Sequence, residues 1–461
     1  MQVAAPRILI AGTASGVGKT TLACGLLRLL ARRGLRVQAA KCGPDYLDPM
    51  MHTRVLGIPS RNLDLFFAEE GLVRELVAEG ARSADITVIE GAMGYYDGIS
   101  QSHAASAYDL ARATQTPAVL VVDARGRALS VAAEVAGFRR FRDPSQVVGV
   151  ILSRVSEGYF PTMREMVERE TGVRVLGYVP ELAGAVLESR HLGLVAAGEV
   201  ADLGRRVDLM ADALEQTIDV DGLLALAHAA PELAYEPPQL PEPCVGSPVI
   251  AVAFDEAFDF YYEDTLTLLE RLGARLVRFS PLEDHHLPAG TCGLYLGGGY
   301  PELHAARLSS NEGLRTEVRE AISAGMPTIA ECGGFMYLHE TLQDAEGVSW
   351  PMVSAVPGAC HGLGRLGRFG YVILTARRAS LLADAGQSLP AHEFHYWDSD
   401  QPGDAFHAQK PQSSRGWDCV VATPTLYAGY PHLYLASCPG ATKRFVDACA
   451  SFGLAGRAGC L

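Results

Sequence analysis

A glycine-rich segment near the N-terminus, GTASGVGKTT over residues 12–21, has the residue types that bind a phosphate chain. Small residues let backbone N–H groups wrap around phosphate oxygens, and a helix that begins here adds partial positive charge. Lys19 would reach the β- and γ-phosphates, and the Thr20 hydroxyl is suited to Mg²⁺. The alternative is a glycine-rich turn that binds nothing. The predicted nucleotide site consists of Gly16, Gly18, Lys19, Thr20 and Thr21.

Two carboxylates are candidates for a further contact to Mg²⁺. Glu90 ends the apolar run ITVIE, and ligands of open α/β sheets bind where such strands end. Asp45 lies shortly after the candidate strand at residues 37–41, in the segment KCGPDY. The alternative for each is a carboxylate that caps a loop. The predicted metal ligands are therefore Thr20, Asp45 and Glu90.

A second kind of chemistry is indicated by Cys332 in the segment TIAECGGFM. A strand, a sharp turn with two glycines and a helix would leave this thiol exposed beside a helix N-terminus. That position lowers the pKa of a thiol and makes it a nucleophile. The alternative is a structural cysteine, which is usually buried in an apolar element.

Acyl transfer at a thiol needs donors for the oxyanion and a base. The segment GGGYPEL follows another candidate strand, and its backbone N–H groups could hold an oxyanion together with that of the glycine after Cys332. The predicted donors are Gly298, Gly299 and Gly333. His432 is the preferred base, and the pattern alone leaves His392 and His395 open as a rival pair.

The elements that would position these residues alternate between β-branched runs and amphipathic stretches. This rhythm predicts βαβ units and parallel sheets in an α/β fold. Strands are expected over residues 7–11, 37–41, 86–90, 118–123 and 147–152. Helices are expected over 20–33, 102–114 and, in one or more pieces, 201–230.

Residues 231–248 contain six prolines, which favours a linker over a helix or a central strand. The alternation then restarts with strands at 249–254, 275–279, 293–296 and 328–330 and a helix at 260–272. The 461 residues exceed what one core usually holds, so two domains are expected. They are residues 1–230, which contain the phosphate loop, and residues 249–461, which contain Cys332, with 231–248 as the linker.

The composition of the chain disfavours several classes of binding partner. The formal net charge of −14 disfavours nucleic acid and anionic membranes. The ten cysteines contain no C-x-x-C pair, so neither a zinc site nor a disulfide framework is indicated. The first residues lack the layout of a signal peptide and no apolar stretch could span a bilayer. A cytoplasmic enzyme with small-molecule substrates is expected.

Several longer motifs occur in one order along most of the chain. Together they resemble the cobyrinic acid a,c-diamide synthase family, which is called hydrogenobyrinic acid a,c-diamide synthase in the oxygen-dependent pathway. The resemblance extends from about residue 7 to about residue 439. It is carried by KCGPDYLDPMMH (41–52), SRNLDLFF (60–67), EGAMGYYDG (90–98), SRHLGL (189–194), DEAFDFYYEDTLTLLERLGA (255–274), FSPLED (279–284), LGGGYPELHA (296–305), AECGGFMYL (330–338), HEFHY (392–396) and the segment around Tyr430 and His432.

The resemblance implies a dethiobiotin-synthetase-like phosphate-loop domain followed by a class I glutamine amidotransferase-like domain. It implies Cys332 as nucleophile and His432 as its base, with ATP and Mg²⁺ as cofactors and a homodimer as a possible assembly. The reaction would convert the a and c acetates of the macrocycle into amides, through an acyl phosphate and ammonia from glutamine. The residues assigned to the substrate end are Asp45, Tyr46, Asp48 and Asp97.

Three departures from the family pattern stand out. The family usually shows His-Leu-His where this chain has His432, Leu433 and Tyr434. Tyr434 occupies the position two beyond His432, where many such glutaminases carry a glutamate. Ser153 precedes Arg154 where asparagine is commoner. The alternatives are a nickel-sirohydrochlorin a,c-diamide synthase, a cobyric acid synthase, a regulatory ATPase with an inactive second domain, and a tetrapyrrole carrier without turnover.

Overall fold

The computed structural model describes residues 1–182, 184 and 197–458, which form two compact units, Met1–Pro238 and Gln239–Leu461. The boundary falls inside the proline-rich segment. The first part of that segment is ordered within unit 1, because strand β9 (Leu233–Ala234) pairs with β1 (Gln2–Val3). The motif SRHLGL lies outside the described residues. Among the described residues no helix is both long and apolar enough to cross a membrane.

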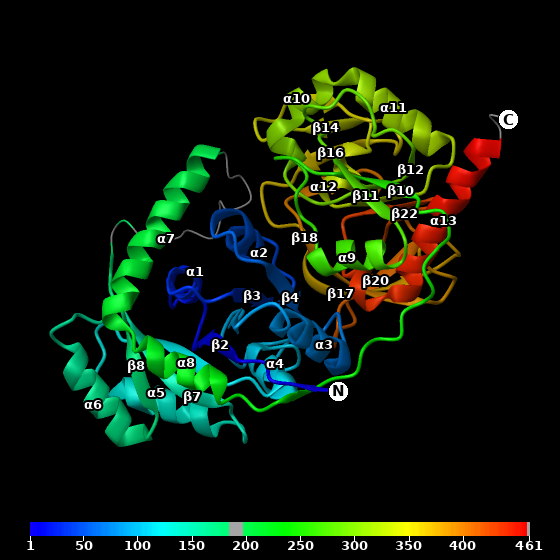
Figure 1. Cartoon of the computed structure of the whole chain (residues 1–461). Coiled ribbons are helices and arrows are strands. Elements are labelled where there is room, and N and C mark those ends of the chain that lie inside the picture. The colour runs from blue at the N-terminus through cyan, green and yellow to red at the C-terminus, as the bar shows by residue number, and fades with distance from the viewer. Residues whose placement is uncertain (183, 185–196, 459–461) are drawn as a thin grey trace. The chain divides into compact units, whose positions relative to one another are not determined.

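Unit 1 contains a seven-stranded parallel sheet (Figure 1). The five predicted strands are present, and two further strands extend the sheet at its edges. The central strand leads into the phosphate loop, and the strand order changes direction beside it, where ligands of open sheets bind. The order is β4 (Ser60–Leu63), β3 (Val37–Cys42), β5 (Ile86–Glu90), β2 (Arg7–Gly12), β6 (Ala118–Asp123), β7 (Val147–Ser153) and β8 (Arg174–Val179).

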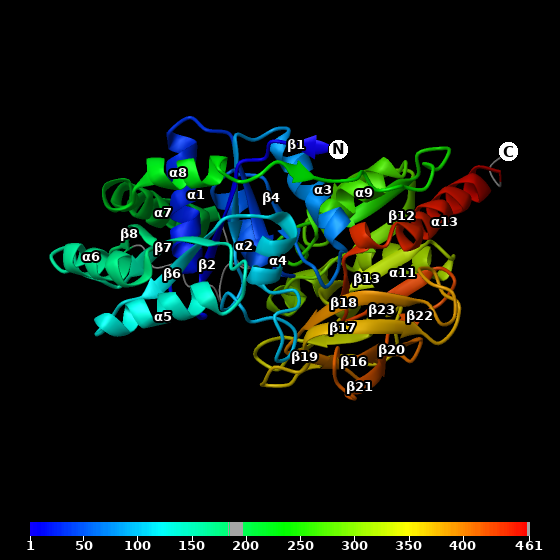
Figure 2. The same cartoon turned by 90° about the horizontal axis from the view of Figure 1, so that it is seen from below.

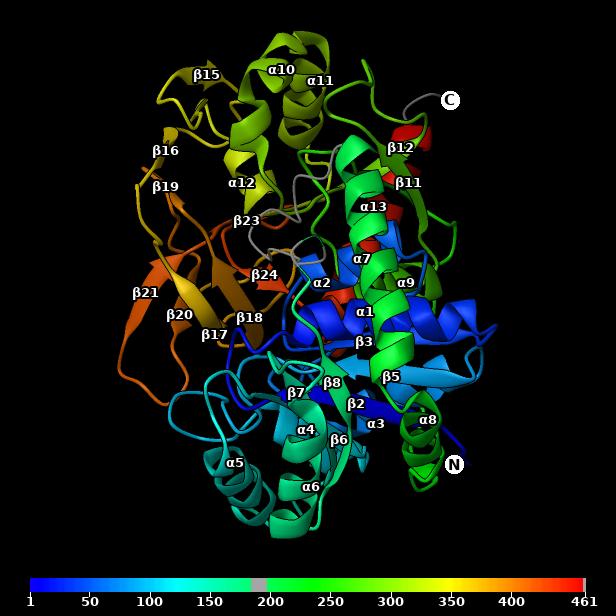
Figure 3. The same cartoon turned by 90° about the vertical axis from the view of Figure 1, so that its left-hand side faces the viewer.

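Helices cover both faces of this sheet. On one face α1, α7 and α8 share an apolar core with the strands. On the other face lie α4 and α5 (Figure 2, Figure 3). The helices of unit 1 are α1 (Lys19–Arg32), α2 (Leu47–Met50), the π-helix η1 (Met51–Val55), α3 (Glu70–Ala81), α4 (Ala107–Thr114), α5 (Leu129–Arg140), α6 (Phe160–Thr171), α7 (Ala197–Thr217) and α8 (Val220–His228).

Capping residues explain two differences from the predicted helices. The helix expected over 102–114 begins at Ala107, because the Ser106 side chain accepts a hydrogen bond from Asp109 N and caps the first turn. The helical region expected over 201–230 is two helices. Asp219 accepts a hydrogen bond from Gly222 N and starts the second of them.

Unit 2 contains a six-stranded sheet that is parallel except for its last strand. Its strands, in spatial order, are β11 (Arg275–Phe279), β10 (Val249–Ala253), β12 (Thr291–Leu296), β13 (Thr328–Glu331), β23 (Leu426–Gly429) and β22 (Val421–Ala422). Its helices are α9 (Glu263–Arg271), η3 (Pro301–His304), α10 (Ala305–Ser310), α11 (Glu312–Ser323), α12 (Gly333–Tyr337), η4 (Leu435–Ser437) and α13 (Pro439–Ala458). The helix expected over 260–272 is therefore shorter at both ends.

Two further sheets of unit 2 were not predicted. One is antiparallel and consists of β21 (Gly416–Cys419), β20 (Phe406–Gln409), β17 (Phe369–Ala376), β18 (Ser388–Phe394) and β24 (His432–Leu433). The other consists of β15 (Ser349–Pro351), β14 (Thr341–Gln343), β16 (Ala359–Gly362) and β19 (Trp397–Ser399). Most of these strands are short, and only the two longest, β17 and β18, show alternating burial over more than four residues.

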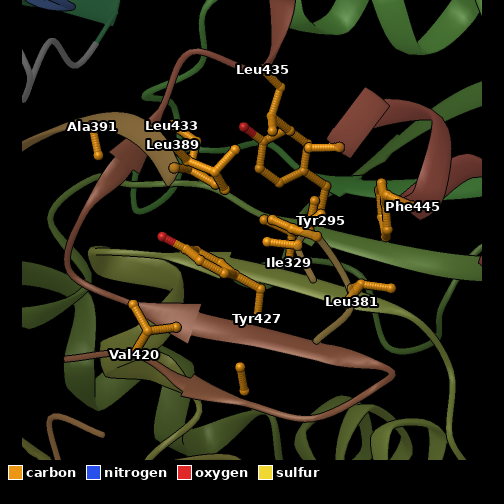
Figure 4. Packing of buried hydrophobic residues seen from close by; sticks show 14 of the residues in the cluster. Tyr295, Ile329, Leu381, Leu389, Ala391, Val420, Tyr427, Leu433, Leu435 and Phe445 are labelled. Atoms are coloured by element: carbon orange, nitrogen blue, oxygen red, sulfur yellow. The ribbon is translucent and has the colours of Figure 1, made fainter. Parts of the chain in front are cut away.

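The antiparallel sheet packs on the parallel sheet of unit 2 through one apolar core (Figure 4). Tyr295, Ile329 and Tyr427 come from three neighbouring parallel strands. Leu389 and Leu433 come from the antiparallel sheet and enter the same cluster. Leu433 of β24 thereby packs against the strands that lead to the thiol turn.

Candidate active sites

The phosphate loop connects β2 to α1 with a backbone that depends on glycine. Gly16 and Gly18 have φ angles of +76° and +99°, which L-residues with a side chain rarely adopt. A Cβ on Gly12 would lie 2.7 Å from the Val17 Cγ2 atom, so the loop also closes tightly on the strand that precedes it. This local backbone agrees with the nucleotide loop predicted from the sequence.

Lys19 lies folded over this loop. Its Nζ donates hydrogen bonds to the carbonyl oxygens of Ala14, at 2.9 Å, and Met93, at 2.6 Å. Burial, together with the nearby Lys41 charge, lowers the pKa of Lys19 to about 8. The ammonium therefore lies at the mouth of the loop, held by neutral acceptors that phosphate oxygens could replace.

Beneath the loop, Thr20 and Lys41 converge on one carboxylate oxygen of Glu90. The Thr20 hydroxyl donates to Glu90 Oε1 at 2.6 Å, and Lys41 Nζ lies 3.0 Å from the same atom. Lys41 also forms an ion pair with Asp48. Although burial opposes the charge, Asp48 and Glu90 raise the pKa of Lys41 well above its usual range. Lys41 outweighs burial in the same way and holds the pKa of Glu90 below its usual range.

The second carboxylate oxygen of Glu90 faces His52. The distance from His52 Nε2 to Glu90 Oε2 is 3.6 Å, and His52 Nδ1 lies 3.0 Å from Ser60 Oγ. All three residues are buried. Sequence reasoning assigned no role to His52 or Lys41. The signal for Lys41 was available, because a charged residue near the end of a buried strand is the feature that singled out Glu90.

The oxygen donors at this position fit a magnesium ion. In nucleotide sites Mg²⁺ keeps several waters and uses phosphate oxygens, so it needs only one or two oxygens from the protein. Thr20 and Glu90 supply such a pair. Within the described part of the chain, no cluster of three or more His, Cys, Asp or Glu side chains is arranged to hold a metal ion by itself.

The residues assigned to the substrate end differ in their burial and in their partners. Asp45 is half-exposed, accepts a hydrogen bond from Leu47 N at 2.9 Å and lies 4.0 Å from Lys41 Nζ. Tyr46 is buried at the start of α2, and Asp48 is buried against Lys41. Burial raises the pKa of Asp48, with a further contribution from Glu90.

Asp97 is exposed on the segment that follows Glu90. Its Oδ2 atom accepts a hydrogen bond from Gly94 N at 3.1 Å. A Cβ on Gly94 would lie 3.1 Å from the Thr13 carbonyl oxygen, so this segment lies against the phosphate loop. Asp45 and Glu90 are both near Lys41, and Asp97 is close enough to Lys19 to raise its pKa slightly against the larger effect of burial.

Arg154 adds a contact that sequence reasoning did not assign. Its guanidinium donates to the Gly16 carbonyl oxygen at 2.9 Å and pairs with Asp123 at 2.6 Å. Arg154 itself has a φ of +59°, an uncommon conformation for a residue with a side chain. The neighbouring Ser153 hydroxyl donates to the Val122 carbonyl at 3.4 Å.

In unit 2 the thiol turn has the strained backbone that the sequence predicted. Cys332 joins β13 to α12 with φ +47° and ψ −102°. Its N–H donates to the Gly429 carbonyl at 2.8 Å, and Gly334 N donates to the Gly297 carbonyl at 2.8 Å. The turn is thus bound to the ends of the two strands on either side, and a non-glycine residue at such angles is a feature of functional sites.

One expectation about Cys332 was wrong. The side chain is buried, with 7% of its surface exposed, and burial raises the pKa of the thiol, an effect that ionisation of Glu302 would increase. The helix that follows has only five residues, too short for its dipole to outweigh this burial. In the free protein the thiol is therefore protonated.

The predicted oxyanion donors lie next to one another. A Cβ on Gly333 would lie 3.0 Å from Gly299 N and 3.3 Å from the Gly298 carbonyl carbon. Gly299 has a φ of +152°, and a Cβ there would lie 2.1 Å from the Ala257 carbonyl oxygen. Gly299 therefore has no room for a side chain and Gly333 has little, and their backbones meet next to Cys332.

The ring of His432 reaches the same place. A Cβ on Gly298 would lie 2.5 Å from His432 Cε1, so the imidazole packs on the glycine loop. Burial lowers the pKa of His432 to about 3, with smaller contributions from His392 and His395. His395 instead stacks on Tyr430, with ring centroids 3.9 Å apart. Because Gly298 lies next to Gly333, the contact of His432 with Gly298 places the imidazole at the thiol turn.

His392 lies opposite His432 in the pairing of β18 with β24. Its ring contacts Phe369 and Tyr371, and burial lowers its pKa to about 3. The hydroxyl of Tyr434, the departure two residues beyond His432, donates to Asp264 Oδ2 on α9 at 2.9 Å. Position 434 thus carries no carboxylate, and its hydroxyl instead joins this segment to α9 by a hydrogen bond.

Comparison with known proteins agrees with this two-site architecture. Residues 8–193 match the CobQ/CobB/MinD/ParA nucleotide binding domain. Residues 249–439 match the CobB/CobQ-like glutamine amidotransferase domain. The two matches include the phosphate loop and the thiol turn respectively, and they confirm the α/β fold class expected from the sequence.

Curated relatives are similar to nearly the whole chain. A cobyrinate a,c-diamide synthase of Salmonella typhimurium is 41% identical over 95% of this chain and 97% of its own length. Proteins of the same name from Caldanaerobacter subterraneus subsp. tengcongensis and Thermoplasma volcanium are each 39% identical over 96% of this chain, and over 98% and 97% of their own lengths.

Solved structures match smaller parts. PurLQS from Thermotoga maritima is 16% identical, with a TM-score of 0.33 over 45% of this chain and 99% of that chain. The MinD cell division protein of Aquifex aeolicus is 16% identical, with a TM-score of 0.32 over 48% of this chain and 95% of that chain. The family assignment depends on the curated relatives and the domain matches: the chain belongs to the cobyrinate a,c-diamide synthase family.

Proposed function

We propose that this protein uses ATP and glutamine to convert the a and c acetate carboxylates of cobyrinic or hydrogenobyrinic acid into amides. The observation that carries the proposal is the presence of both halves of the chemistry in one chain. A phosphate loop over buried Lys41 and Glu90 is joined in sequence to a strained Cys332 turn with His432 beside it. Two relatives named cobyrinate a,c-diamide synthase match 96% and 95% of this chain, which supports the choice of substrate.

In the glutaminase reaction, His432 takes the thiol proton of Cys332 as Sγ attacks the side-chain amide carbon of glutamine. The N–H groups of Gly299 and Gly333, next to Gly298, hold the oxyanion that forms. The C–N bond breaks as His432 returns the proton to the departing nitrogen, which leaves as ammonia. Water then hydrolyses the thioester and releases glutamate.

The neutral resting state of this site suits that sequence. Because burial keeps Cys332 protonated and His432 unprotonated, the proton moves from one to the other when glutamine is in place. A neutral imidazole can accept a proton, and an imidazolium could not. The site therefore needs no preformed thiolate.

In the amide-forming reaction, an oxygen of the substrate carboxylate attacks the γ-phosphorus of ATP and ADP departs, giving an acyl phosphate. Lys19 and Lys41 stabilise the negative charge of the transferring group. Mg²⁺, held by Thr20 and Glu90, would neutralise further charge on the phosphates. Ammonia attacks the acyl carbon. The bond between that carbon and the phosphate oxygen breaks, and inorganic phosphate leaves.

We assign the substrate end of this site to Asp45, Tyr46 and Asp97. Asp45 and Asp97 are the accessible carboxylates near Lys41 and Lys19. Asp48 is buried against Lys41, so its contribution is to fix the ammonium rather than to contact the macrocycle. In this proposal Asp45 is also a candidate ligand of Mg²⁺.

The test compares two variants under two nitrogen sources. Purified protein is given ATP, Mg²⁺ and cobyrinic acid, hydrogenobyrinic acid or nickel-sirohydrochlorin, with either glutamine or ammonium, and product masses are measured. Cys332→Ala should abolish synthesis from glutamine and retain synthesis from ammonia, whereas Lys19→Ala should abolish both. Loss of both activities in a folded Cys332→Ala variant would contradict this division of labour.

The choice of macrocycle is tested in the same experiment. Two carboxylates converted to amides only in the presence of ATP would identify the substrate among the three. Glutamine hydrolysis with no change in any macrocycle would leave a glutaminase whose acceptor is another molecule. Neither activity, in a protein that binds ATP, would favour the regulatory ATPase.

A further inference from the structure

Glu331 is a buried carboxyl group that the proposed chemistry does not use. It is the last residue of β13 and directly precedes Cys332. Its side chain is 1% exposed. The Oε1 atom accepts a hydrogen bond from Leu433 N at 3.0 Å, and Tyr295 donates its hydroxyl to Oε2 at 3.3 Å.

We propose that Glu331 is a positioning residue of the glutaminase site, whose side chain fixes the segment that carries His432 relative to the strand that carries Cys332. The inference deepens the proposed function, on which it rests. It assigns Glu331 no contact with glutamine. Its effect is transmitted through the Leu433 N–H to the residue before it.

The topology explains why such a connection is needed. Cys332 follows β13 of the parallel sheet, whereas His432 begins β24 at the edge of the antiparallel sheet. β24 has two residues and pairs only with β18 among the described strands. The nucleophile and its base are thus carried by different sheets, and the hydrogen bond from Leu433 to Glu331 joins those two sheets directly.

Leu433 is suited to this role because it is held from two directions. Its side chain lies in the apolar core beside Leu389 (Figure 4). Its N–H is held by Glu331. Packing alone would leave the segment free to shift along the core surface, since apolar contacts have little directionality. The hydrogen bond adds the direction, and a displacement of about 1 Å at a catalytic group can lower a rate about 100-fold.

The chemical state of Glu331 agrees with this role. Burial raises the pKa of Glu331 to about 8, so the carboxyl group is mostly uncharged near neutral pH. An uncharged group places no negative charge next to the sulfur when the thiol gives up its proton. The site therefore uses the Glu331 oxygen that accepts the hydrogen bond. A glutamine side chain at position 331 has the same length and carries such an oxygen.

Three substitutions separate this role from general support of the fold. Glu331→Gln keeps the length and the accepting oxygen but not the acid. Glu331→Asp keeps the acid but shortens the reach to Leu433. Glu331→Met keeps the length and removes the acceptor. Tyr434→Phe is the matched control, because it removes a buried hydrogen bond from the same segment.

The measurements are kcat and KM for glutamine hydrolysis, the rate at which iodoacetamide alkylates Cys332, and synthesis from ammonia. Glu331→Met and Glu331→Asp should lower kcat about 10- to 100-fold, the range expected for a misplaced catalytic group. KM for glutamine and synthesis from ammonia should stay near the wild-type values. Glu331→Gln and Tyr434→Phe should retain most of kcat.

The order of the variants decides the outcome. If Glu331→Asp hydrolyses glutamine as fast as Glu331→Gln, or if Glu331→Met keeps full kcat, the positioning role is wrong. Should Glu331→Met not fold, the contrast between Gln and Asp still gives the answer. Failure of the proposed function has a separate signature, which is a wild-type protein that hydrolyses no glutamine or a Cys332→Ala variant that hydrolyses it equally well.

Discussion

In unit 1 the groups beneath the phosphate loop are charged although they are buried, whereas in unit 2 the groups around the thiol are buried and uncharged. Lys41 and Glu90 hold each other ionised. Cys332 is kept protonated by burial, and His432 is kept neutral by the same cause. In unit 1 the buried groups are therefore ionised by their partners, and in unit 2 burial keeps the groups neutral.

The difference follows from what each proposed substrate brings. A nucleotide arrives with several negative charges, so a site that already holds oriented cations loses little by reorganising. Glutamine presents a neutral amide, and charge develops only during the reaction. Buried ion pairs cost free energy to assemble, so their presence under the phosphate loop indicates a function there rather than a contribution to stability.

The largest expected effect would break the charged cluster. Glu90→Gln keeps an acceptor for the Thr20 hydroxyl but removes a counter-charge of Lys41. Breaking a buried ion pair costs about 3–5 kcal/mol, so unit 1 should be destabilised by that order and amide synthesis should be lost with both nitrogen sources. Glutamine hydrolysis should persist.

Spectroscopy can separate the two units in this experiment. Trp350, Trp397 and Trp417 are the only tryptophans, and all lie in unit 2. An early unfolding transition in circular dichroism without a matching change in tryptophan fluorescence would locate the damage in unit 1. Glu79→Gln, which loses a partly exposed pair with Arg61, should cost less than about 1 kcal/mol.

A slightly smaller effect is expected from crowding the thiol site. Gly298→Ala places a Cβ 2.5 Å from His432 Cε1, so the ring must move. Glutamine hydrolysis should fall about 100-fold, the effect expected for a displaced catalytic group, while synthesis from ammonia continues. Gly313→Ala is the control, because its Cβ would meet nothing closer than 3.9 Å. A Gly298→Ala variant with near-normal hydrolysis would remove His432 from the site.

The pH dependence of stability sharpens the comparison. Burial raises the pKa of Glu302 and Glu331 to about 8, above the usual 4.5. Between pH 6.5 and 8 the folded unit holds protons that the unfolded chain has released, so stability falls as pH rises. Below pH 6.5 His392 and His432, which are neutral in the folded protein, act in the opposite direction, because the unfolded chain then binds more protons.

Urea unfolding followed by tryptophan fluorescence should therefore show the free energy of unfolding of unit 2 falling as pH rises from 6.5 to 8. It should be nearly level between about pH 4.5 and 6.5, where the two carboxyl groups and the two imidazoles oppose each other, and should fall again below about pH 4.5. Each carboxyl group contributes a slope of at most about 1.4 kcal/mol per pH unit. Glu331→Gln should reduce the slope above pH 6.5 by one such contribution. A slope that is unchanged in this variant would mean that Glu331 is ionised in the folded protein.

The smallest effect is expected from Tyr434→Phe. The hydroxyl donates to Asp264, so its loss should cost about 1 kcal/mol of stability, the usual value for one hydrogen bond. Steady-state assays should show glutamine hydrolysis close to that of the wild type. A large loss of kcat in this variant would instead make Tyr434 part of the machinery around His432.

Local sequence determined much of this protein. Glycines at 16 and 18 allow the left-handed turns of the phosphate loop, and the apolar run before Glu90 becomes a buried strand. The turn at Cys332 was predicted from the glycines that follow it. These features depend on residues adjacent in the chain, whose backbone preferences act over a few positions.

The tertiary structure alone decided the chemical states of the same residues. The expected exposed, acidic thiol is buried and has a raised pKa, because packing from distant segments surrounds Cys332. Lys41, His52 and Glu90 meet through neighbouring elements, and Glu331 meets Leu433 across 102 residues of sequence. Burial and electrostatics depend on what the fold brings near a group, so no local pattern could specify them.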